Sequence, residues 1–236
     1  MIESANETVD DAAPSGAGGV RKLLSFFEPV LVSVRFWWAI CLTCAAILDL
    51  SERHYLNPDG LSYLDMATEA LRSGPAALLN GYWNPAYPAL LSVALAIFHP
   101  SRDHEIPVVY LVNFFIFALT LWGFTYFLRQ WLKYADTLGS SSDRYKRYFV
   151  PFAFSTFLLF MLKESDYRAA HPDMLAAAII FFAVGATCRL SLSGSSNKHY
   201  AALGLALGIV YYARVALFPL AVVLLIGCSS TRPRSK

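Results

Sequence analysis

Two long apolar runs, residues 30–50 and 107–128, constrain the fold of this chain more than any other feature. A helix needs about 20 residues to cross the roughly 30 Å hydrocarbon layer of a membrane, and both runs reach that length. The whole chain is 56% hydrophobic and only 15% charged, whereas soluble domains have about 45–50% apolar and about 25% charged residues. The sequence therefore predicts an all-α polytopic membrane protein.

Further apolar runs lie at 82–98, 148–162, 173–188, 200–213 and 215–228. The last two are separated by a single charged residue, Arg214, and together they predict a short helical hairpin. Run 82–98 is broken near its start by Pro85 and Pro88, which leaves about 11–13 helical residues spanning less than about 20 Å. We therefore predict about six transmembrane segments, including the hairpin, and we expect 82–98 to stay at the membrane surface.

The distribution of Lys and Arg predicts the topology. The segment 129–147 holds five Lys and Arg residues, and the N-terminal flank holds Arg21, Lys22 and Arg35. Such basic segments prefer the cytoplasmic side. Both lie on that side only if the chain crosses the membrane twice between them. Residues 51–106 then form one long outer loop, in which we predict juxtamembrane helices at about 60–72 and 86–98. In the first of these helices Leu61, Leu64, Ala67 and Leu71 share one face, a pattern typical of an amphipathic helix at the membrane surface.

These predictions divide the chain into three parts. Residues 30–228 form the transmembrane domain. Residues 1–29 are interpreted as a disordered cytoplasmic tail, because the first twenty of them consist mainly of Ser, Ala, Gly and acidic residues. Residues 229–236 are interpreted as a basic cytoplasmic tail.

Two aspartates are candidates for chemistry, and the predicted topology places both on the outer side. Asp59 lies in Asn57-Pro58-Asp59-Gly60, residues typical of a turn, just before the helix predicted at 60–72. Asp173 follows Pro172 at the start of another predicted helix. For each of them the structural alternative is a role at a helix start, since Asp is a preferred N-cap residue and Pro is favoured in the first turn.

Arg214 is a candidate because a lone arginine between apolar runs is costly in lipid and therefore has an anionic partner by default. The alternative is that its long side chain extends to the headgroups. The outer loop also carries aromatic residues that either belong to the aromatic belt of the membrane interface or stack on a sugar or lipid ligand. They are Tyr63, Tyr82, Trp83 and Tyr87.

The sequence gives no support for a metal or another cofactor. The five histidines lack metal-ligand spacing, and Cys41-x-x-Cys44 lies inside an apolar run without a second cysteine pair to complete a zinc site. We interpret these cysteines as small apolar side chains. The net charge of +2 gives no reason to expect a nucleic-acid partner.

Taken in order, these residues resemble the amino-terminal portion of the GT-C membrane glycosyltransferases, in the bacterial branch similar to protein O-mannosyltransferases and aminoarabinose transferase. The matching stretches are Pro58-Asp59-Gly60-x-x-Tyr63-Leu64, Trp83-x-Pro85-x-Tyr87-Pro88, Asn113, Pro172-Asp173, and Gly204-x-x-x-Gly208 followed by Arg214 and Pro219. The resemblance covers about residues 30–228. One departure is Gly60, because the O-mannosyl branch usually has Glu after the loop aspartate.

The resemblance implies transfer of a sugar from a polyprenyl-phosphate donor to an acceptor hydroxyl. Transfer would occur on the extracytoplasmic side of the bacterial inner membrane. Asp59 would be the catalytic base and Asp173 the second carboxylate of the cavity. The residues that would bind the substrate or its lipid phosphate are Arg214, Tyr63, Asp65, Trp83 and Tyr87.

Two other classes of protein remain open. A transporter or channel would carry charged residues inside its spans, whereas runs 107–128 and 173–188 contain no acidic residue beyond Asp173 at the entrance. That pattern favours an enzyme. A non-catalytic membrane subunit is the third possibility, because family members usually have many more membrane helices than this chain.

Overall fold

The computed structural model describes residues 29–139, 143–164, 170, 172–192 and 197–230. The regular structure in these residues is helical throughout. The main helices are α2 (Val34–Glu52), α3 (Pro58–Ser73), α4 (Ala86–Phe98), α5 (Glu105–Thr137), α6 (Asp143–Leu159), α7 (Asp173–Leu192), α8 (Asn197–Ala213) and α9 (Phe218–Ser230). Short 3₁₀ turns are η1 (Pro75–Leu78), η2 (Arg102–His104) and η4 (Val215–Leu217), and η3 (Phe160–Glu164) is π-helical. Most of the tails predicted at 1–29 and 229–236 lies outside the described residues.

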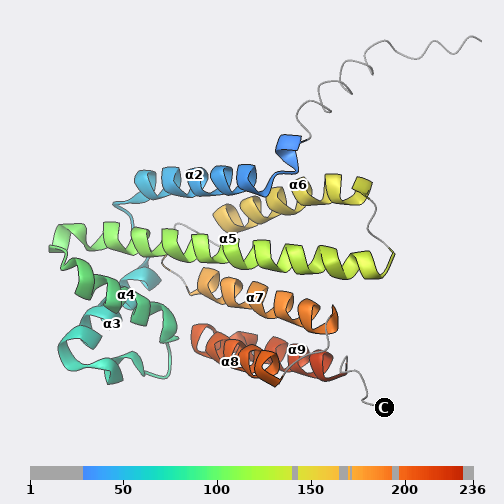
Figure 1. Ribbon diagram of the computed structural model, residues 1–236. Coiled ribbons are helices and arrows are strands. Elements are labelled where there is room, and N and C mark those ends of the chain that lie inside the picture. The colour runs from blue at the N-terminus through green and yellow to red at the C-terminus, as the bar shows by residue number, and fades with distance from the viewer. Residues whose placement is uncertain (1–28, 140–142, 165–169, 171, 193–196, 231–236) are drawn as a thin grey trace, which may run out of the picture.

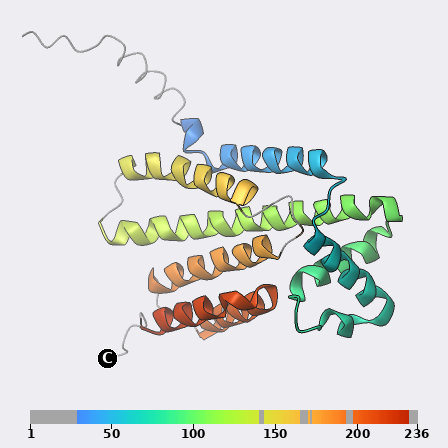
Figure 2. The ribbon, with the colours of Figure 1, turned by 180° about the vertical axis from the view of Figure 1, so that it is seen from behind.

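Six of the helices lie alongside one another, and successive members of this group run in opposite directions (Figures 1 and 2). They are α2, α5, α6, α7, α8 and α9. The central helix is α5, with α2 on one side and α7 on the other, and α8 packs on the far side of α7. Helices α3 and α4 pack together at one end of this bundle, which we call the loop end.

Within the described residues, three helical segments are long and apolar enough to cross a membrane: Val34–Glu52, Arg102–Thr137 and Asp173–Leu192. The helices α4, α8 and α9 are apolar but shorter. At 13 residues, α4 is only about 20 Å long. Its bounds, Ala86–Phe98, coincide with the helix predicted at 86–98.

The central helix is longer than the sequence predicted. We expected the apolar run 107–128 to end in a basic connection, but α5 continues to Thr137. Residues 129–137 include Arg, Gln, Leu, Lys and Ala, which are good helix formers, and they contain no Gly or Pro. The helix ends where Gly139 adopts a φ of 70°, as is common just after a helix C-terminus.

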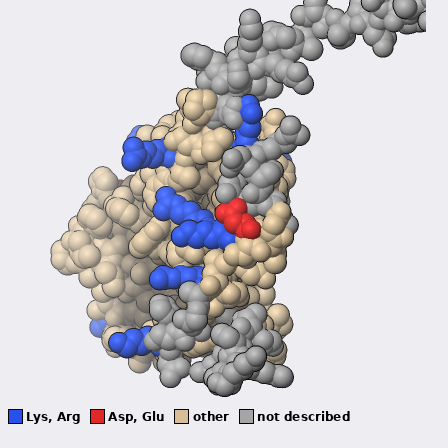
Figure 3. Space-filling view, turned by 45° about the vertical axis from the view of Figure 1, so that its right-hand side comes forward, with Lys and Arg blue, Asp and Glu red and all other residues tan. Residues whose placement is uncertain are grey.

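Lys and Arg side chains gather at the opposite end of the bundle, which we call the basic end (Figure 3). Helices α5 and α7 end there, and α6 and α8 begin there. The residues concerned include Arg129, Lys133, Arg147, Arg189 and Lys198.

Close packing of α7 on α5 fixes the position of the first turn of α7. A Cβ on Gly123 of α5 would lie 2.8 Å from the carbonyl oxygen of Ala178, and a Cβ on Gly185 would lie 2.7 Å from the ring of Tyr126. Small residues at such points let two helix backbones approach closely. In addition, the buried hydroxyl of Thr120 donates a hydrogen bond of 3.0 Å to the carbonyl oxygen of Met174.

Candidate functional site

Helix α3 begins at Pro58, two residues before the start predicted at about residue 60, and this changes the role of Asp59. Asn57 is the N-cap residue, with extended backbone angles, and Pro58 occupies the first helical position. That position suits proline, whose missing N–H would have no partner there. The interpretation of Asp59 as an N-cap is therefore wrong. Asp59 is exposed in the first turn, where the positive end of the helix dipole favours an anion.

The side chain of Asn57 joins α3 to the segment that precedes α7. Its Oδ1 accepts a hydrogen bond of 3.1 Å from the backbone N–H of Ala170. Gly60 is buried at the same junction: a Cβ there would lie 2.6 Å from Asn57 Oδ1 and 2.8 Å from the Ala170 Cβ. A side chain at this position would force these neighbouring side chains to shift.

The buried face of α3 differs in part from the predicted one. We expected Leu61, Leu64, Ala67 and Leu71 to share the apolar face. Leu64 and Ala67 are buried, but Leu61 and Leu71 are 50% and 48% exposed. Tyr63 is buried in their place because its ring packs against Trp83, just before α4, and against Tyr87 in the first turn of α4.

Tyr63, Trp83 and Tyr87 form what we call the aromatic cluster. The ring centroid of Tyr63 lies 4.9 Å from that of Trp83 and 5.4 Å from that of Tyr87, both in edge-to-face geometry. The Tyr87 hydroxyl donates a hydrogen bond of 2.8 Å to Oδ1 of Asn113 on α5. The cluster therefore holds α3, the loop before α4, and α5 together.

Asp173 and Arg214, both chosen from the sequence, form an ion pair. Asp173 lies in the first turn of α7, as predicted, and Arg214 is the residue between α8 and η4. Both side chains remain partly open to their surroundings, at 39% and 43% exposure. The pair is therefore only partly buried, although the Asp173 Oδ1 atom that contacts Arg214 is itself buried.

The corner that carries Arg214 also contacts the loop of the aromatic cluster. The backbone N–H of Val215 donates a hydrogen bond of 3.3 Å to Oδ1 of Asn84, and Asn84 directly follows Trp83 in the chain. On the other side of the loop, Asn80 Oδ1 accepts hydrogen bonds from the N–H groups of Tyr82 and Trp83, at 3.0 and 2.8 Å. The hairpin corner and the aromatic cluster thus belong to one site.

The pKa of Tyr63 connects this site to Asp59. Burial raises that pKa above its usual value, the negative charge of Asp59 raises it further, and the positive charge of Arg214 opposes the rise. Tyr63 is therefore close enough to both charged groups for their charges to affect its pKa. At neutral pH its hydroxyl stays protonated and can donate a hydrogen bond.

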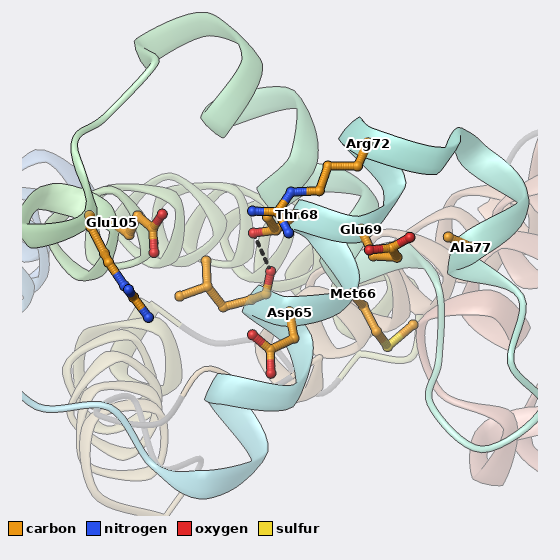
Figure 4. Close-up of a pocket in the computed structure, with 9 residues that line it drawn as sticks. Asp65, Met66, Thr68, Glu69, Arg72, Ala77 and Glu105 are labelled. Carbon is orange, nitrogen blue, oxygen red and sulfur yellow. Dashed lines mark hydrogen bonds between the residues drawn. The ribbon is translucent and has the colours of Figure 1, made fainter.

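Asp65 lies apart from these residues. It lines a different pocket, of about 780 Å³, between α3, η1 and the start of α5 (Figure 4). Its polar neighbours there include Thr68, Glu69, Arg72, Arg102 and Glu105. The predicted site residues thus fall into two groups, with Asp65 in one and the aromatic cluster, Asp173 and Arg214 in the other.

The asparagines that join the site were not predicted from the sequence. Asn57 and Asn84 each make a hydrogen bond to a backbone N–H far away in the chain. The feature of the sequence that could have indicated them is that both precede a proline. A residue before a proline disfavours the helical conformation and prefers an extended one. Such residues occur where a loop is held in a defined shape.

Comparison of the chain with protein-family models, with curated proteins and with solved structures found no match.

Proposed function

We propose that this protein is a membrane glycosyltransferase of the GT-C type. In this proposal it transfers a sugar from a polyprenyl-phosphate donor to an acceptor hydroxyl, at the loop end of the bundle. The loop end faces outward from the bacterial inner membrane. The observation that carries the proposal is the partly exposed Asp173–Arg214 pair beside the aromatic cluster.

Arg214 is suited to stabilise the departing lipid phosphate. The residues flanking it, in α8 and in η4 and α9, form apolar helices, so the donor's tail can remain in lipid while its phosphate meets the guanidinium. A fixed cation at the point where negative charge develops is among the largest contributions to catalysis. Arginine also matches a phosphate with two parallel N–H donors.

Asp59 is suited to act as the general base. In the proposed step the acceptor oxygen attacks the anomeric carbon of the sugar, and the bond from that carbon to the phosphate oxygen breaks. The phosphate leaves with the bonding electron pair, and Asp59 takes the proton of the acceptor hydroxyl. The influence of both Asp59 and Arg214 on Tyr63 supports a common site for these two roles.

We further propose about six membrane segments. To the three long apolar segments are added α6 with its continuation η3, and the hairpin of α8 and α9. The alternating direction of these helices in Figure 1 supports this count. In the same arrangement α3 and α4 lie at the membrane surface.

Binding of a polyprenyl phosphate to the purified protein tests this function. We expect the purified protein in lipid nanodiscs to bind a polyprenyl phosphate, and the variant Arg214→Gln to bind it at least about tenfold more weakly, since a hydrogen-bonded charge contributes about 1.5–3 kcal/mol. The variant Arg72→Gln, in the separate pocket of Asp65, is the matched control and should bind normally. Equal binding by both variants would contradict the role of Arg214. Binding without consumption of any sugar-linked donor would instead indicate a non-catalytic membrane subunit.

A further inference from the structure

A second cavity lies away from the loop end, between α5, α7 and α8. It measures about 260 Å³, and most of its lining is apolar. The lining consists of small and apolar residues, among them Ala183, Ala186, Ala202, Leu203 and Ala206. Tyr126 and Phe182 form its aromatic wall.

One lining residue carries a charge, and its position gives the cavity a direction. Arg189 lies in the last turn of α7 and is exposed. It belongs to the basic end of the bundle, where Arg129, Lys133 and Lys198 also lie. The cavity therefore extends from a cationic mouth toward the apolar part of a helix that is long enough to cross the membrane.

We infer that this cavity is a binding site for an anionic phospholipid. One acyl chain lies along the alanines of α7 and α8, and the phosphate contacts Arg189 at the mouth. Basic pockets between transmembrane helices bind anionic headgroups, because the surrounding positive charge and the apolar walls recognise the two parts of such a lipid. This inference is independent of the proposed glycosyl transfer, since it uses other residues at the other end of the bundle.

The chemistry of the cavity favours a lipid with net negative charge over a zwitterionic one. The positive side chains of the basic end would repel the ammonium group of a zwitterionic headgroup. Each basic side chain near an anionic headgroup strengthens binding by about fivefold. The small side chains of Ala186 and Ala206 leave room for a methylene chain, and larger side chains there would fill it.

The test is competition between two lipids for the purified protein. The delipidated protein in detergent is mixed with equal amounts of phosphatidylglycerol and phosphatidylcholine, and bound lipid is counted by native mass spectrometry. We expect the protein to retain phosphatidylglycerol in preference, and Arg189→Gln to lower that preference about fivefold. The control variant Arg102→Gln, at the loop end, should keep it.

A second variant tests the cavity itself. Ala186→Phe fills the space and should lower retention of both lipids, and Ala202→Phe serves the same purpose if the first variant does not fold. A wild-type protein that retains both lipids equally would overturn the inference. So would unchanged preference in Arg189→Gln, or normal lipid retention in a folded phenylalanine variant.

Discussion

Asp173, in the first turn of α7, forms an ion pair with Arg214, the residue that follows α8. Without a ligand, the guanidinium that we assign to the lipid phosphate is already paired with a carboxylate. A phosphate must therefore compete with Asp173 for Arg214. The pair is partly exposed, so its own contribution to stability is small, at about 0–1 kcal/mol.

This competition predicts the effect of removing the carboxylate charge. Asp173→Asn should bind a polyprenyl phosphate a few-fold more tightly than the wild type, because Arg214 loses its competing partner, while thermal stability changes by no more than about 1 kcal/mol. A titration in nanodiscs measures the affinity. Weaker binding by a folded Asp173→Asn protein would mean that the carboxylate holds Arg214 in place rather than competing with the phosphate.

The close packing around Gly60 leads us to expect that two glycine-to-alanine substitutions differ in their effect on stability. Gly60→Ala inserts a Cβ within 2.8 Å of Asn57 and Ala170, and overpacking of this kind typically costs about 1–3 kcal/mol. Gly208→Ala, in α8, is the matched control, because a Cβ there meets nothing within 4 Å and alanine favours a helix. Thermal unfolding in detergent should show a lower Tm for Gly60→Ala only. Equal Tm values would show that α3 and the segment around Ala170 can separate to accommodate the Cβ at little cost in stability.

The short helix α4 predicts which parts of the chain share one side of the membrane. Leu79 and Ser101 flank α4, and both are exposed. In a cysteine-free background on whole cells, Leu79→Cys and Ser101→Cys should both react with an impermeant maleimide, whereas Leu138→Cys at the basic end should not. Labelling of only one of the first two positions would show that α4 crosses the membrane.

The local elements of this fold could be predicted from the sequence, whereas its contacts could not. Two prolines and an apolar run predicted the helix at 86–98, and Asp173 lies in the first turn of α7, directly after Pro172, as expected. The start of α3 was misplaced because Pro58 was interpreted as part of a turn, although proline also fits the first helical position. Periodicity gave the direction of the amphipathic face, but the packing of Tyr63 decided which residues are buried.

The candidate site shows the same division. Residue type and position alone indicated Asp173 and Arg214, and the structure brings them together. The separation of Asp65 into another pocket depends on how α3 packs against η1 and the start of α5. The hydrogen bonds that Asn57 Oδ1 and Asn84 Oδ1 accept from backbone N–H groups join segments that are distant in the chain, and no local pattern predicts such partners.

The most direct test of the proposed function is the rate of sugar-donor consumption by Asp59→Asn compared with the wild type. Asp59 is exposed and is not the N-cap of α3, so the substitution should leave stability near normal. If Asp59 is the general base, transfer should fall at least about 100-fold, because removing such a base typically costs about 10²–10⁴-fold in rate. Asp65→Asn, in the separate pocket, should keep nearly full activity. More than a tenth of the wild-type rate in Asp59→Asn, or a wild-type protein that consumes no polyprenyl-phosphate sugar, would contradict the proposal.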